Sequence, residues 1–318
     1  MQFFIERGRL LSMEHLLEII PAYQLLIFAF FFGASWGSFA NVVIVRWPKG
    51  LSVVRPASHC PSCEHPIAFY DNIPVLSYFL LRGKCRHCRA NFSPRYAVVE
   101  LCMGLLAVAV LNLTLLNNPP SILYGLTEFF VWFAFVWALV TAGMIDLETF
   151  LLPDAITLPG VAIGILVNAF VLKTGWIDFV VGAFGGYAVL ALLFVHGYKL
   201  LTGYSGMGEG DPKLVAMIGA FLGIKGAVFA VFVAAIQGLV IGSILLVVRK
   251  RSGKGPRPVL HEHEMDENGK DILDGAGFHK ARVPFGPFLA LGAIEYLFLG
   301  DLLLGYYTTL LHSLYGLF

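Results

Sequence analysis

The stretch Gly206-Met207-Gly208-Glu209-Gly210-Asp211-Pro212-Lys213-Leu214 separates two long apolar runs of the chain. A carboxylate at the edge of an apolar run is costly to keep in a membrane, so Asp211 is a candidate functional residue. The alternate glycines before it allow the backbone to turn tightly and to approach another segment closely. An earlier apolar run ends in Met144-Ile145-Asp146, which offers a second carboxylate. We expect Asp146 and Asp211 to form one site.

The composition is that of a protein embedded in a bilayer. Hydrophobic residues make up 58% of the 318 residues and charged residues only 14%, where soluble domains carry roughly a quarter charged residues. Spans need ~20 apolar residues, which predicts an all-α polytopic membrane protein with about eight transmembrane helices. The predicted spans are 22–45, 97–116, 122–145, 155–172, 177–200, a short helix and a longer one within 214–248 broken near 223–226, and one or two spans within 284–318.

The charge distribution predicts the orientation of these spans. The segment from Arg46 to Arg95 holds 8 of the 22 Lys and Arg residues, against two acidic ones. Basic loops are retained in the cytoplasm, so we expect this segment there. Counting spans from it places Asp146 and Asp211 at the same cytoplasmic face. The bilayer is therefore a predicted partner of the whole chain.

Two Cys-x-x-Cys pairs lie in this basic segment, Cys60 with Cys63 and Cys85 with Cys88. Disulfides are rare in a reducing compartment, and two such pairs together provide the four thiolates of a closed tetrahedral site. A closed site leaves no open position for water, so the sequence predicts structural Zn²⁺ rather than catalytic Zn²⁺. The alternative is four unligated thiols.

The two aspartates have the chemistry of a peptidase. Two close carboxylates share a proton, so that one activates water while the other donates to the scissile carbonyl. The sequence contains no His-Glu-x-x-His, Gly-x-Ser-x-Gly or P-loop motif. Helix position suggests Asp211, at an N-terminus, as the base and Asp146, at a C-terminus, as the proton carrier. Asp211 before Pro212 could instead be only an N-cap. The alternative acids are Glu148, Asp154 and Glu209.

With these motifs the chain resembles the type IV prepilin leader peptidases, membrane aspartic peptidases of the GxGD type. The resemblance covers almost the whole chain. It rests on segments 37–43, 60–63, 71–77, 82–88, 95–96, 145–146, 152–154, 206–214 and 284–290.

The resemblance implies that Asp146 and Asp211 are the catalytic pair. It implies cleavage of a basic leader from type IV prepilins and type II secretion pseudopilins, at the cytoplasmic side of the bacterial inner membrane. Members with four cysteines then N-methylate the new N-terminus with S-adenosylmethionine, and their cytoplasmic loop is implicated in this step. The sequence shows no separate methyl-donor motif, and nucleic acid is not an implied partner.

This interpretation divides the chain into three parts. Residues 1–45 comprise an amphipathic segment and the first span, 46–95 the cytoplasmic zinc module, and 96–318 the peptidase domain. The polar insertion 252–282 within the last part is longer than the family leads us to expect. It is rich in His, Asp and Glu, which indicates a solvated loop or, alternatively, a weak metal site.

Two other functions remain open from the sequence. The enzyme could be a peptidase alone, with the zinc loop positioning substrate. The chain could also be a non-enzymatic membrane assembly protein or transporter, with the aspartates acting only as caps. Carboxylates more than about 10 Å apart would favour that last interpretation, because one water could not reach both.

Overall fold

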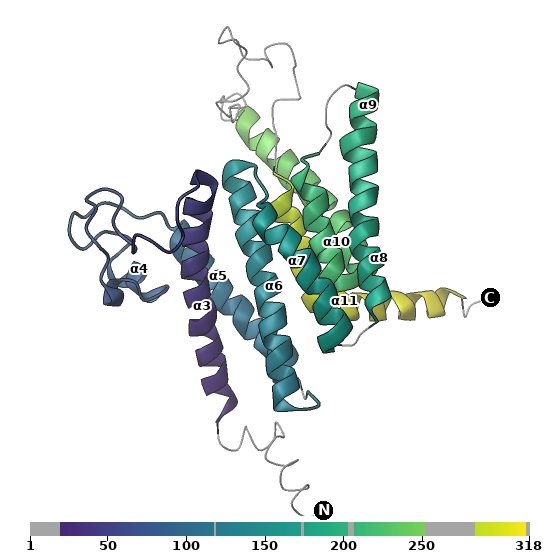
Figure 1. The fold of residues 1–318 in the computed structure, drawn as a ribbon, viewed down its shortest axis with the longest axis horizontal. Coiled ribbons are helices and arrows are strands. Elements are labelled where there is room, and N and C mark those ends of the chain that lie inside the picture. The colour runs from purple at the N-terminus through teal and green to yellow at the C-terminus, as the bar shows by residue number, and fades with distance from the viewer. Residues whose placement is uncertain (1–19, 118, 173–174, 203–206, 252–283, 316–318) are drawn as a thin grey trace, which may run out of the picture.

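The computed structural model describes residues 20–117, 119–172, 175–202, 207–251 and 284–315. The predicted amphipathic segment, Gly206 and the polar insertion 252–282 lie outside the described residues. Within those described, the regular structure is helical, with two isolated β-bridges in the four-cysteine loop. The elements in chain order are α3 (Ala22–Arg46), η1 (Trp47–Lys49), η2 (Phe69–Asp71), α4 (Leu76–Leu80), α5 (Arg95–Thr114), α6 (Ile122–Thr149), α7 (Asp154–Leu166), η3 (Val167–Leu172), α8 (Trp176–Leu190), η4 (Ala191–Gly197), α9 (Tyr198–Thr202), α10 (Gly210–Arg251) and α11 (Gly286–Tyr315) (Figure 1).

The prediction of a polytopic helical protein is confirmed. In the described part of the chain, six helices are long and apolar enough to cross a membrane, and Gly286–Gly300 of α11 is a shorter apolar helix. The element α10 counts once among the six, although it contains a break. Dividing it there and adding α11 gives the predicted number of about eight. The π-helical segments η3 and η4 continue α7 and α8.

The element α10 is a helical hairpin with two arms. Gly223 has non-helical backbone angles, φ 71° and ψ −175°, which confirms the predicted break. The two arms lie together, because a Cβ at Gly186 of α8 would contact both Val215 of the first arm and Ala227 of the second. A side chain at Gly223 would collide with the Asp178 carboxylate of α8, and its positive φ also favours glycine.

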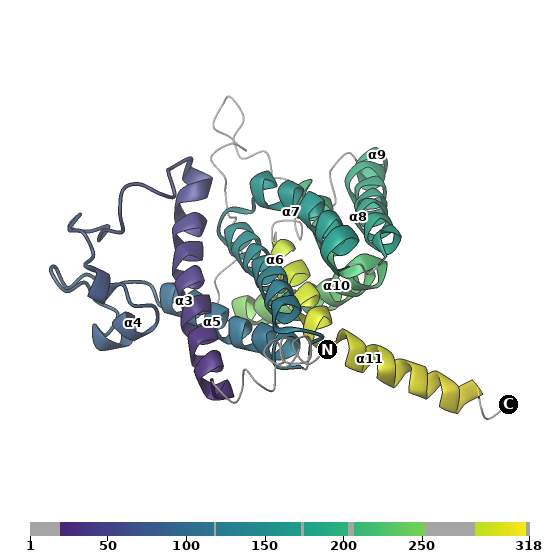
Figure 2. The same ribbon diagram turned by 60° about the horizontal axis from the view of Figure 1, so that its bottom comes forward.

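The helix α6 joins two packed groups. One face lies in a core with α3 and α5, through Phe129, Phe133 and Ile145. Another face lies in a core with α10 and α11, through Phe135 and Leu139. Figure 2 shows the loop with α4 beside α3 and α5, on the far side of the bundle from α8 and α9. The four-cysteine loop therefore lies between the first two spans, as predicted, and α6 connects its supporting helices to those that carry the aspartates.

Candidate functional site

Asp146 lies in the last turn of α6, with only 5% of its surface exposed. Its Oδ2 accepts a hydrogen bond of 2.9 Å from the backbone N–H of Gly286, the first residue of α11. A Cβ at Gly286 would lie 2.6 Å from that oxygen. Position in the sequence predicts only the unfavourable C-terminal dipole of α6. The structure adds the N-terminus of α11, which favours a negative charge at the same carboxylate.

Asp211 is the second residue of α10 and is 7% exposed. It therefore lies inside the first turn rather than at the N-cap position that the Asp-Pro pattern suggested. Its backbone N–H donates to the carbonyl of Gly208 at 3.3 Å. A Cβ at Gly210 would lie 2.7 Å from the Cβ of Leu152, so glycine there allows the turn to press against the segment between α6 and α7.

Asp146 and Asp211 lie within reach of each other's charge, although 65 positions separate them in the sequence. Both lie at helix ends and both are buried. Two acidic groups in a shared, largely dehydrated site disfavour double ionisation and hold one proton between them. This arrangement can activate a water and protonate a carbonyl at once.

The three alternative acids differ from this pair. Asp154 accepts from Lys213 at 2.7 and 2.8 Å. Glu148 forms an ion pair with Arg95. Glu209 is exposed. None shares the burial of Asp146 and Asp211. The ion pairs instead connect segments around the site, α7 to α10 and α5 to α6.

The four cysteines form one cluster, in which all the Sγ atoms lie within 4.8 Å of one another. The Sγ atoms of Cys60 and Cys88 are 3.7 Å apart. Sulfurs bound to tetrahedral Zn²⁺ at about 2.3 Å would be about 3.8 Å apart. The cluster therefore has the dimensions of a four-thiolate zinc site, as the sequence predicted, and the donor set fits that metal.

Each cysteine pair is held by the same backbone turn. The N–H of Cys60 bonds to the carbonyl of His65 at 3.0 Å, and the N–H of Cys85 bonds to that of Ala90 at 2.8 Å. A residue with positive φ follows each pair, Glu64 in one and Arg89 in the other. The backbone N–H of Ser62 lowers the pKa of the Cys60 thiol to about 6, whereas burial and the neighbouring cysteines raise the pKa of Cys63. The loop therefore favours the thiolate, the form that binds metal, at Cys60 rather than at Cys63.

The chain matches two family models. Residues 31–113 match the "Bacterial Peptidase A24 N-terminal domain", and residues 133–243 match the "Type IV leader peptidase family". The four cysteines lie in the first match and the two aspartates in the second.

Three relatives bear the name "Prepilin leader peptidase/N-methyltransferase". The protein of Aeromonas hydrophila is 34% identical over 93% of this chain and 99% of its own. That of Myxococcus xanthus is 33% identical, over 86% of this chain and 90% of its own. That of Burkholderia pseudomallei strain 1026b is 32% identical over 90% of both. No solved structure matches the chain.

Proposed function

This chain belongs to the type IV leader peptidase family and is an enzyme of that type, and from this premise we propose that it cleaves the leader from type IV prepilins and type II secretion pseudopilins. Cleavage takes place at the cytoplasmic face of the bacterial inner membrane. N-methylation of the new N-terminal residue follows, with S-adenosylmethionine as the methyl donor. The names of the relatives and the geometry of the buried aspartates support this proposal.

The observation that carries the peptidase function is the burial of two carboxylates, Asp146 and Asp211, at the ends of helices that share one hydrophobic core. In the proposed reaction, one carboxylate removes a proton from the attacking water while the other donates a proton to the scissile carbonyl oxygen. Collapse of the tetrahedral intermediate breaks the C–N bond, the leaving amine takes up the proton of the first carboxyl, and a hydroxyl proton of the intermediate returns to the second carboxylate. The N-termini of α10 and α11 favour negative charge on Asp211 and Asp146 respectively. Their roles are therefore more nearly equal than sequence position suggested.

The four-cysteine loop provides the second part of the proposal. Cys60, Cys63, Cys85 and Cys88 would hold Zn²⁺ as a structural ion, because four thiolates fill a tetrahedral shell. S-adenosylmethionine supplies an electrophilic methyl group. The neutral N-terminal amine attacks it, a C–N bond forms as the C–S bond breaks, and the amine loses a proton to solvent.

Cleavage followed by mass spectrometry of the mature N-terminus tests this function. We would use the full chain in detergent with a prepilin and S-adenosylmethionine, comparing wild type, Asp146→Asn and Asp211→Asn. Because general acid–base catalysis contributes about 10²–10⁴-fold, each variant should lose at least about a hundredfold in rate. Asp154→Asn removes an exposed, ion-paired carboxylate from the same face and serves as the control. Near-normal cleavage by either catalytic variant would remove that aspartate from the mechanism.

The same experiment separates the bifunctional enzyme from the peptidase alone. The wild-type product should gain the mass of one methyl group. A mature product that stays unmethylated would leave the loop with a positioning role only. The non-enzymatic alternative required aspartates far apart, and the interaction between the two carboxylates argues against it.

A further inference from the structure

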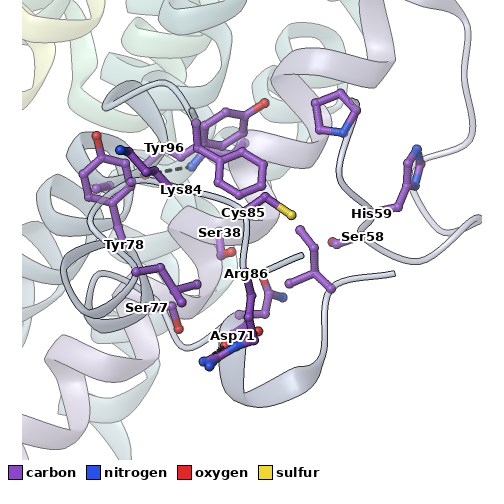
Figure 3. A pocket seen from close by; sticks show the side chains of 18 of the residues that line it. Ser38, Ser58, His59, Asp71, Ser77, Tyr78, Lys84, Cys85, Arg86 and Tyr96 are labelled. Carbon is purple, nitrogen blue, oxygen red and sulfur yellow. Dashed lines mark hydrogen bonds and ion pairs between the residues drawn. The ribbon is translucent and has the colours of Figure 1, made fainter. Parts of the chain in front are cut away.

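A cavity of about 620 Å³ lies between the four-cysteine loop and the helices α3 and α5. Figure 3 shows Tyr78, Lys84 and Tyr96 at one end of it and the Asp71–Arg86 pair at the other. Small-molecule sites measure about 300–1,000 Å³ and combine apolar walls with a few polar groups. Neither the aspartate pair nor the metal cluster accounts for this cavity, although Cys85 forms part of its wall.

A buried hydrogen-bond acceptor lacks a donor in this wall. Asn41 of α3 is 3% exposed and lines the cavity. Its Nδ2 donates to the carbonyl of Tyr96 at 3.1 Å, which fixes the amide. Its Oδ1 has no hydrogen-bond partner. Leaving a buried acceptor unpaired costs about 1–3 kcal/mol, so a ligand with an N–H or O–H group suits this position.

The charges that line the cavity are not all paired. Asp71 accepts two hydrogen bonds from Arg86, at 2.5 and 2.7 Å. Glu100 of α5 accepts one from the N–H of Val75 at 2.8 Å. Within the described residues, Glu100 and Lys84 form no ion pair. The cavity therefore presents one carboxylate, Glu100, and two cations, Lys84 and Arg46, of which Arg46 donates to the carbonyls of Ser52 and Pro56. Such a lining suits a ligand that carries both signs of charge.

The ion pair between Arg95 and Glu148 links the wall of the cavity to the helix that carries Asp146. Tyr96 lines the cavity, and the neighbouring Arg95 pairs with Glu148, two residues after Asp146 in α6. The guanidinium of Arg95 also lies 4.8 Å above the Tyr96 ring. A ligand in the cavity is therefore adjacent to the element that holds one catalytic aspartate.

We propose that this cavity binds S-adenosylmethionine, an inference that rests on the proposed methyltransferase function. Glu100 provides the negative charge for the cationic methionyl part, and Lys84 faces its carboxylate. Asn41 Oδ1 accepts a hydrogen bond from a donor of the ligand. The rings of Tyr78 and Tyr96 give the adenine an aromatic wall. The metal cluster keeps the loop folded over the site.

Direct binding of S-adenosylmethionine tests this assignment without relying on turnover. We would titrate the full, zinc-loaded chain in lipid nanodiscs by calorimetry. Glu100→Gln keeps an acceptor for the Val75 N–H but removes the charge, and should weaken binding about tenfold or more, as expected for a charge-assisted contact. Glu64→Gln removes an exposed charge from the same loop outside the cavity, and should bind like wild type.

A second pair of variants tests occupancy of the cavity. Ser58 lines it, whereas Val54 lies outside it and is 77% exposed. Ser58→Trp should abolish binding by filling the space, whereas Val54→Trp should leave it intact. Prepilin cleavage by all four variants should stay at the wild-type rate, which shows that each one folds.

The outcomes separate this site from the function on which it rests. If Glu100→Gln and Ser58→Trp both bind S-adenosylmethionine as tightly as the wild type does, the cavity assignment is wrong. The proposed methyltransferase function is not affected by that result. Wild-type protein that neither binds S-adenosylmethionine nor methylates its product would overturn both. Asp146→Asn should lose prepilin cleavage and still bind S-adenosylmethionine. Failure of the proposed peptidase function can therefore be recognised independently of the binding result.

Discussion

The first arm of α10 and the four-cysteine loop hold their functional groups in different ways. Every residue from Leu214 to Phe221 is buried, so Asp211 begins a helix that is packed on all sides. In the loop, Val54, Phe69 and Leu80 are 77%, 87% and 78% exposed, while Cys60 and Cys85 are buried. The difference teaches that helix packing fixes the aspartates, whereas the loop has little apolar core and is expected to depend on a metal ion held by its cysteines.

Removing the metal should have the largest effect and should be confined to the loop. Structural zinc contributes about 10 kcal/mol or more to the folding of small zinc modules. Chelation should therefore give rapid hydrogen exchange in residues 50–94, with little change in α10. Deuterium uptake followed by mass spectrometry measures both segments at once. Equal loss of protection in α10 would contradict the separation of the two regions.

Gly223→Ala should destabilise the bundle next most strongly. The added methyl group meets the Asp178 carboxylate, and the positive φ of this turn costs a further ~1–3 kcal/mol for a residue with a side chain. Thermal unfolding in detergent should show a lower midpoint. Gly242→Ala is the control, because nothing lies within 4 Å of its added methyl group. Equal midpoints for the two variants would remove the hairpin turn as a source of stability.

Gly286→Ala should reduce cleavage about ten- to a hundredfold while leaving the loop intact. Its methyl group would lie 2.6 Å from Asp146 Oδ2 and displace the carboxylate from its N–H donor, and small displacements of reacting groups cost rates of about this size. Kinetics with a prepilin measures the effect. In Gly238→Ala the methyl group meets Phe288 at an ordinary 3.7 Å. A similar rate loss there would indicate general sensitivity of the α10–α11 contact.

Asp71→Asn should have the smallest effect, visible as a pH dependence of loop stability. The guanidinium of Arg86 lowers the pKa of Asp71 below its usual value. The pair therefore stabilises the folded loop above the unfolded pKa, and this contribution is lost as the pH falls through the lower folded pKa. Hydrogen exchange of the zinc-loaded loop should differ between wild type and variant at neutral pH and converge in acid. A constant difference at every pH would assign the effect to packing instead.

Much of this architecture could be predicted because its signals are local. Apolar runs predict the spans, Cys-x-x-Cys pairs predict the four-cysteine cluster, and Gly223 lies in the predicted break. The bond from Gly286 to Asp146 could not be predicted, because it joins positions 140 residues apart whose approach depends on packing. The segment 284–290 was noted only through the family resemblance. The π-helical segments were also missed, since a shifted hydrogen-bond register leaves an apolar sequence pattern almost unchanged.

The hairpin of α10 has a further consequence for how deep the chemistry takes place. Its tip lies beside Asp178, in the first turn of α8. From Gly223 the first arm rises only about 18 Å to Asp211 at the helical rise per residue, whereas a bilayer interior is about 30 Å thick. If Asp178 lies at one headgroup boundary, Asp211 would lie about 12 Å inside the other.

In the proposed reaction, water and the scissile peptide would both have to reach that depth. Lipid tails of different length would raise or lower the headgroups relative to the two carboxylates, at a modest cost in mismatch. We therefore expect the rate of the proposed cleavage to depend on membrane thickness. Shorter acyl chains would bring the two carboxylates closer to bulk solvent, and longer ones would bury them further.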